Sequence, residues 1–103
     1  MKLGPVLHII NRSFPHPAFD MARSASTAED AFLFMEDGVT ALLAGGHADA
    51  SLYEWMAAGK AYALTADVKA RGIEGKLVQW VERVDYDGFV ELTERYPTVL
   101  SWF

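Results

Sequence analysis

Short apolar runs, each followed by a helical pattern, are the feature that most constrains the fold of this chain. Three runs of strand length are almost continuously apolar: Val6–Ile10, Ala31–Met35 and Ala61–Leu64. Such runs are typical of strands that are buried on both faces of a parallel sheet. A fourth strand is expected around Val81–Asp85 and a fifth at Val99–Trp102. The alternation of strands with helices predicts an α/β fold, in which right-handed crossovers cover both faces of the sheet.

The expected helices lie between these strands and carry recognisable end signals. Phe89, Leu92 and Tyr96 repeat at helical spacing, and Pro97 ends that last helix because it lacks a backbone N–H. Gly72 supplies a left-handed stop for an earlier helix. The signals for helix starts are, in chain order, Pro17, Asp37, the capping-box pair Ser51 and Glu54, Thr65, and the acidic pair Asp85 and Asp87.

The length of 103 residues suits one domain spanning residues 1–103. Hydrophobic residues make up 51% of the chain, and counting glycine in place of tyrosine puts the share modestly above the usual value of about 45–50%. This composition favours a subunit that buries surface against a partner. No apolar run approaches the roughly 20 residues that span a bilayer, and the start has no apolar core of signal-peptide length. We therefore expect a cytoplasmic protein without a membrane partner.

Charge and residue types limit the chemistry. The chain has no cysteine, which excludes disulfides, thiolate metal sites and a cysteine nucleophile. The net charge of −5 opposes binding to a phosphate backbone, so no direct contact with nucleic acid is expected. The histidines His8, His16 and His47 lack the spacing of metal ligands. Neither a metal nor a cofactor is expected.

Other candidate motifs have simpler structural explanations. Ser13 and His16 could form a nucleophile and base, but no G-x-S-x-G turn surrounds the serine. The glycines match no nucleotide-binding loop. Asp37, Asp85 and Asp87 could form an acidic cluster, yet each lies at a strand-to-helix junction, where helix capping explains it. The sequence alone therefore contains no self-sufficient active site.

Several segments together resemble the DsrH/TusB family of sulfur-relay proteins, within the DsrE-like superfamily. These segments are Leu7–Ser13, Phe34–Val39, Ala61–Leu64, Asp67, Ala70–Gly72, Val84–Thr93 and Ser101–Phe103. The resemblance implies a three-layer α/β/α domain with a five-stranded parallel sheet in the order 4-3-2-1-5. It also implies one subunit of a heterohexamer, TusBCD-like or DsrEFH-like, which passes persulfide sulfur between cysteines.

The resemblance further implies a role. Some family members carry a cysteine in the first helix, and the corresponding position here falls at or next to Ala22. The chain is thus expected to be a non-catalytic TusB-like subunit that supports 2-thiouridine formation at the tRNA wobble position. Its partners would be TusC/TusD-like or DsrE/DsrF-like subunits, and a downstream sulfur carrier would be reached through the complex. The alternatives are a DsrH-like subunit in sulfur oxidation and a stand-alone small-ligand or regulatory domain.

The implied strand order places a switch point where the first and fifth strands meet. A polar site is expected there, formed by Asn11, Arg12 and Ser13 with Asp37, because open α/β sheets bind ligands at the carboxyl ends of their strands. Alternatively, Arg12 pairs with the terminal carboxylate of Phe103 and anchors the last strand. Trp55 and Trp80 are the expected interface residues because they lie on short or irregular segments.

Overall fold

The computed structural model describes residues 4–46, 49–56 and 60–103. It contains a five-stranded sheet in which every strand pairs in parallel with its neighbours. The strands are β1 (Val6–Ile10), β2 (Ala31–Phe34), β3 (Lys60–Leu64), β4 (Val81–Val84) and β5 (Thr98–Trp102). Their spatial order is β4-β3-β2-β1-β5, so the α/β class and the expected strand order are both confirmed.

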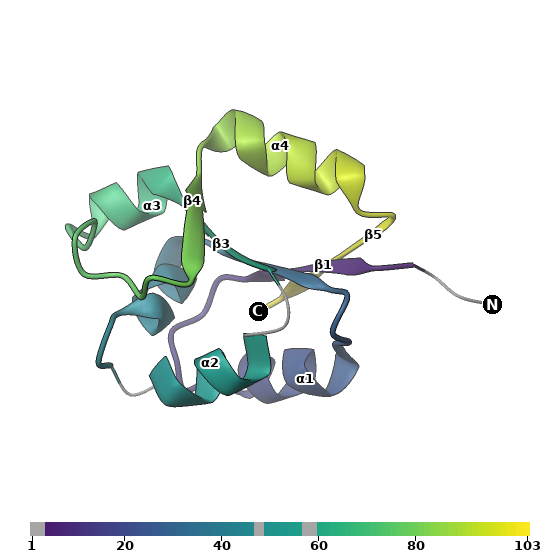
Figure 1. Ribbon diagram of the computed structural model, residues 1–103, viewed down its shortest axis with the longest axis horizontal. Coiled ribbons are helices and arrows are strands. Elements are labelled where there is room, and N and C mark those ends of the chain that lie inside the picture. Colours follow the sequence, from purple (N-terminus) through teal and green to yellow (C-terminus); the bar gives the residue numbers. More distant parts are fainter. Residues whose placement is uncertain (1–3, 47–48, 57–59) are drawn as a thin grey trace.

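Helices cover both faces of this sheet (Figure 1). They are α1 (Pro17–Ala25), the 3-10 helix η1 (Glu36–Leu42), α2 (Asp49–Met56), α3 (Thr65–Ala70) and α4 (Tyr86–Arg95). Helices α1 and α2 lie on one side of the sheet and α4 lies on the other, which produces three layers. None of the helices in the described ranges is long and apolar enough to cross a membrane.

The side chains of the central strands alternate between two hydrophobic clusters. Ile10, Phe32 and Phe34 pack with residues of α1, η1 and α2. Leu7 and Leu33 point to the opposite face and pack with Leu92 of α4. The runs are almost continuously apolar because both of these faces are buried, as the sequence predicted for β1 to β3.

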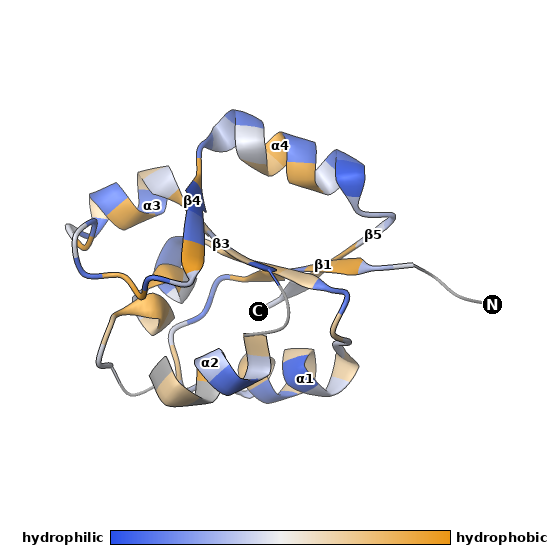
Figure 2. Cartoon of the chain, in the orientation of Figure 1, coloured by the Kyte–Doolittle hydropathy of each residue, from blue (hydrophilic) through white to orange (hydrophobic). Residues whose placement is uncertain are grey.

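The two edge strands are more exposed than the central three. In β4 the middle residues Glu82 and Arg83 are exposed, and Figure 2 shows this hydrophilic centre in blue. In β5 the three middle residues are exposed as well, but none of them is charged. The edges of the sheet therefore differ in chemistry although they have similar exposure.

Helix starts agree with the sequence in some places and differ in others. Asp85 caps α4 as expected, since its carboxylate accepts a hydrogen bond from the Gly88 N–H at 2.8 Å. Gly72 has a positive φ of 64° after α3, which confirms the left-handed stop. The prediction of a capping box at Ser51 was wrong, because α2 already begins at Asp49.

Two further capping predictions were also wrong. Asp37 does not cap an α-helix: it lies inside η1, which begins at Glu36 with Met35 as its N-cap. Thr65 is the first residue of α3 instead of its cap, and Leu64 precedes the helix without a side-chain hydrogen bond. Strand β3 runs directly into α3, so no loop residue remains in which a capping side chain could sit.

Candidate functional site

The carboxyl ends of β1 and β5 lie side by side, with Ile10 in register with Trp102. The exit of β1 continues into Asn11, Arg12 and Ser13, which are the predicted polar residues. Arg12 and Ser13 are exposed, whereas Asn11 is half-buried. The Asn11 Oδ1 atom is itself buried and has no hydrogen-bond partner in the described part of the chain. This edge of the sheet therefore exposes the cation of Arg12, whereas the unsatisfied Asn11 acceptor is enclosed.

The start of η1 packs tightly against the same exit. The Met35 N–H donates to the Ile10 carbonyl at 3.0 Å, and a Cβ added to Gly38 would lie 2.2 Å from that carbonyl oxygen. This contact brings Asp37 to the predicted edge of the sheet. Its carboxylate, however, accepts a hydrogen bond from Arg71 at 2.8 Å, so Asp37 is bound to the end of α3 instead of to Asn11 or Arg12.

The alternative role for Arg12 is not observed. Across the ranges that the structure describes, no ion pair or hydrogen bond joins Arg12 to Phe103. A few residues further on, His16 Nδ1 accepts a hydrogen bond from the Ala18 N–H at 3.0 Å and so caps α1. That bond places the imidazole in a capping role, which argues against the nucleophile-and-base pair with Ser13.

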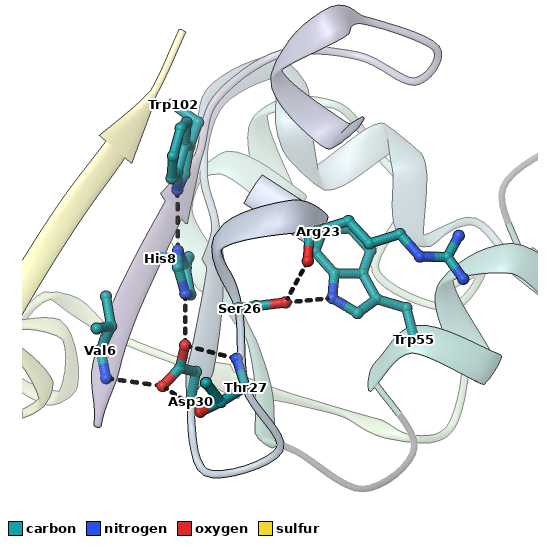
Figure 3. A network of polar contacts seen from close by, with 8 residues as sticks. All are labelled: Val6, His8, Arg23, Ser26, Thr27, Asp30, Trp55 and Trp102. Atoms are coloured by element: carbon teal, nitrogen blue, oxygen red, sulfur yellow. Dashed lines mark hydrogen bonds and ion pairs between the residues drawn. The ribbon is translucent and has the colours of Figure 1, made fainter. Parts of the chain in front are cut away.

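A buried polar network lies behind this edge and links three strands (Figure 3). His8, in the middle of β1, has Nε2 2.8 Å from Asp30 Oδ2. Its other ring nitrogen, Nδ1, accepts a hydrogen bond from the Trp102 indole at 2.9 Å. Asp30 precedes β2, and its carboxylate also accepts bonds from the Val6 N–H and from the N–H and hydroxyl of Thr27.

The partners of His8 determine which tautomer it adopts. An indole N–H can only donate, so His8 Nδ1 must be unprotonated. The Nε2 atom then carries the proton and donates it to the Asp30 carboxylate. His8 is therefore neutral and its two nitrogens are both satisfied.

The Asp30 carboxylate is ionised in this arrangement. Burial of the side chain by itself would raise its pKa, but hydrogen bonds from His8, Val6 and Thr27 more than offset that effect, so the pKa is lowered from its usual 3.8. Because His8 and Asp30 are both buried, the network has no access to a substrate. It connects β1, β2 and β5 and serves the fold.

Sequence reasoning missed this network. His8 was considered only as a metal ligand, Trp102 only as the end of a strand, and Asp30 not at all. One signal was available: a histidine inside an apolar strand and an aspartate directly before another must find partners, because buried polar groups are almost always hydrogen-bonded. The register of the strands was needed to show that they find each other.

The two tryptophans predicted at an interface occupy different environments. The Trp55 indole donates to Ser26 Oγ at 2.9 Å and its ring packs edge-to-face on Phe32, so it joins α2 to α1 and to the core. Trp80 is half-buried and packs on exposed Tyr53. It also lines a shallow cavity of about 330 Å³ with Tyr62 of β3.

Ala22, at or next to which the resemblance implies a family cysteine, is enclosed. Ala22 lies on the inner face of α1 and is 0% exposed, within the cluster that contains Phe19 and Phe34. A side chain at this position faces the core instead of the solvent. Among the described residues, no group of three or more His, Asp or Glu is placed to hold a metal ion, and His47 lies outside the described residues.

Comparison with known proteins identifies relatives along most of the chain. A family model described as "DsrH like protein" matches residues 13–99. Curated relatives include Protein TusB of Salmonella dublin and of Salmonella enteritidis PT4 (strain P125109). Each is 41% identical over 73 residues, which cover 71% of this chain and 75% of the relative.

Two solved structures share the fold. The ychN protein from E. coli superimposes with a TM-score of 0.76 at 18% identity and covers 96% of this chain and 98% of that protein. Protein Tm0979 from Thermotoga maritima superimposes with a TM-score of 0.62 at 24% identity, with coverage of 87% and 92%. At these identities the likeness concerns the fold alone.

Proposed function

This chain belongs to the DsrH/TusB family, and from that membership we propose that it is a subunit of a sulfur-relay complex that carries no sulfur itself. In such a complex, sulfur moves as a persulfide between cysteine thiolates. This chain would hold together or position the subunits that carry those cysteines.

The absence of cysteine is the observation that carries this proposal. A persulfide forms only on a thiol, because the thiolate is the attacking group in each transfer. The first helix supports the same conclusion, since some family members have a cysteine at or next to Ala22, and here Met21, Ala22 and Arg23 occupy these positions. The chemistry must therefore be supplied by partner subunits, which we infer to be TusC/TusD-like.

The relatives favour one pathway. Those that are 41% identical are named TusB, which fits the branch that supports 2-thiouridine at the tRNA wobble position. We infer that this chain serves that branch and not sulfur oxidation. The net charge of −5 fits a subunit that leaves tRNA contact to other proteins.

Deletion of the gene in its host tests this proposal. We expect wobble 2-thiouridine, measured by mass spectrometry of tRNA nucleosides, to fall to the level seen when a cysteine-bearing relay subunit is deleted. A plasmid copy should restore it. The purified chain alone should take up no reductant-labile radiolabelled sulfur. Unchanged 2-thiouridine with a defect in sulfur oxidation would instead support the DsrH-like alternative.

The polar edge at Asn11, Arg12 and Ser13 is proposed as the point where a partner's cysteine-bearing loop approaches. Arg12 supports this because it is exposed and pairs with no acidic group in the described part of the chain. A cation beside a persulfide would stabilise its negative charge.

Replacing Arg12 with alanine separates this role from a structural one. We expect Arg12→Ala to change the free energy of unfolding by less than about 0.5 kcal/mol, because an exposed, unpaired side chain stabilises little. Sulfur transfer by the assembled complex should nevertheless slow. Arg71→Ala is the control for an arginine with a structural role, because Arg71 pairs with Asp37 on η1 and lies at the end of α3. A lower thermal midpoint with normal transfer in Arg12→Ala would contradict the proposal.

A further inference from the structure

The two edges of the sheet are protected differently against pairing with another strand. An unpaired edge exposes backbone N–H and C=O groups, and charged side chains are a common means of blocking it. Edge strand β4 has Glu82 and Arg83 at its centre, one on each face of the sheet. Edge strand β5 has no charged residue, and its Val99 and Leu100 are 38% and 39% exposed. Only β4 carries this protection.

One flank of α4 adds apolar surface beside β5. A Cβ added to Gly88 would meet the Val84 side chain of β4, and Arg95 lines a cavity with Lys60 of β3. The flank of α4 that carries Gly88 and Arg95 therefore faces β3 and β4. By helical spacing, Tyr86, Val90 and Thr93 lie on the opposite flank, toward β5. Tyr86 is 70% exposed. Val99 of β5 points to this face of the sheet, so the flank adjoins Val99, whereas Leu100 points to the opposite face.

An acidic stripe borders this surface. Asp87, Glu91 and Glu94 follow one another at helical spacing on the outer side of α4, and all three are exposed. Across the ranges that the structure describes, none of them forms an ion pair. A partner that covers β5 and reaches over α4 would therefore meet uncompensated negative charge.

This charge distinguishes between possible occupants. A second copy of this chain could pair β5 with β5 in antiparallel fashion, but both α4 helices would then lie on the same face of the joined sheet. Each α4 would bring its acidic stripe to that face, where like charges oppose association. A different chain with basic side chains at the corresponding positions has the complementary charge.

We propose that β5 and the adjoining flank of α4 form the docking surface for the relay partner, which adds an uncharged extended strand to β5 and places basic side chains against Asp87, Glu91 and Glu94. The identity of the partner as a relay subunit rests on the proposed function. Backbone hydrogen bonds along β5 would supply affinity, and the charges of α4 would select the partner.

The strand is held in place before any partner binds. The Trp102 indole donates to the buried His8, and the two rings stack with centroids 6.0 Å apart. All five residues of β5 are in register with β1. A pre-ordered edge loses less conformational entropy on binding than a mobile segment would.

Site-specific photo-cross-linking in the host tests the surface directly. Val99 is replaced by p-benzoylphenylalanine in one strain, and Glu82 in another. These positions are matched, because both are exposed, lie on edge strands and point to the α4 face of the sheet. We expect position 99, and not position 82, to cross-link to an extended segment of a cysteine-bearing relay subunit. Adding Leu100→Lys beside the probe should abolish the product.

The outcomes separate the docking surface from the proposed function. Cross-links from position 99 to a second copy of this chain would overturn the docking proposal, and so would a complex that cross-links from position 82 or from neither position. If Leu100→Lys abolishes a cross-link to a strand of a protein outside the relay, the docking surface stands and the proposed function fails.

Charge variants provide a second measurement on the purified complex. We expect Glu91→Lys to weaken binding of the relay subunit, and the salt dependence of binding to decrease. Glu54→Lys on α2, an exposed residue on the opposite side of the sheet, should leave both unchanged. Equal effects of the α4 and α2 variants would show that α4 acts only through the net charge of the chain. That result would overturn the part of the proposal that concerns α4.

Discussion

Replacement of Asp30 by alanine is expected to lower the free energy of unfolding by about 3 kcal/mol or more. The carboxylate accepts hydrogen bonds from Val6, His8 and Thr27 in a buried position. Alanine would leave the buried His8 N–H without a partner, which costs about 1–3 kcal/mol, and would also remove the part-buried bonds from Val6 and Thr27, each worth about 1.5–3 kcal/mol because the acceptor is charged. The loss would loosen β1, β2 and β5 together, because His8 also holds Trp102.

Urea unfolding at pH 7 measures this effect. The matched control is Asp37→Ala, which removes a carboxylate that is mostly exposed and pairs with Arg71 at the surface. Exposed pairs contribute at most about 1 kcal/mol, so the control should remain close to the wild type. Equal losses in the two variants would show that the buried network contributes no special stability.

The pKa of Asp30 determines how the stability difference between wild type and Asp30→Ala depends on pH. This pKa is lowered in the folded protein from its ordinary value of 3.8. The ionised carboxylate therefore stabilises the fold fully above that value, and the contribution is lost as pH falls from 3.8 through the folded pKa. The stability difference between wild type and Asp30→Ala should be constant near neutrality and shrink on acidification below pH 3.8.

Replacement of Gly38 by alanine is the second large effect that we expect. A Cβ at this position would lie 2.2 Å from the Ile10 carbonyl oxygen and 2.9 Å from the Ile10 carbonyl carbon. Both atoms belong to the backbone of β1, a central strand, so they cannot move aside as the end of a flexible side chain could. We expect the free energy of unfolding to fall by about 3 kcal/mol.

The control for this substitution is Gly75→Ala. No atom lies within 4 Å of a Cβ added to Gly75, and its φ is outside the left-handed region. Alanine should therefore leave stability unchanged or raise it by up to about 1 kcal/mol, since it restricts the unfolded chain. The close contact between η1 and β1 would be in doubt if Gly38→Ala were as stable as Gly75→Ala in the same urea titration. Gly38→Ala should also disturb the polar edge, because η1 packs on Asn11.

Much of the architecture could be predicted because it depends on local or repeated patterns. The central strands were recognised from apolar runs, since a strand that is buried on both faces needs side chains of one kind at every position. The Asp85 cap and the Gly72 stop were found because each acts within a few residues of itself. The strand order came from the family resemblance, because periodicity does not say which strands are neighbours.

The candidate site was less predictable because it combines residues that are far apart in the chain. Asp37 lay at the expected edge, yet its carboxylate is paired with Arg71, 34 residues later. The contacts of Trp55 with Ser26 and Phe32 were not predicted, and its expected place at an interface stays a prediction. A side chain's type limits which bonds it can form, whereas the partner that it meets depends on how the elements pack.

By itself, the sequence determined the α/β class and the absence of thiol chemistry, since apolar runs and the count of cysteines do not depend on how the chain folds. The tertiary structure decided how the polar residues are used. His8 and Asp30 are 22 positions apart, and His8 and Trp102 are 94 apart. Only the parallel pairing of β2, β1 and β5 brings them into hydrogen-bonding distance, and which strands become neighbours depends on the packing of the whole chain.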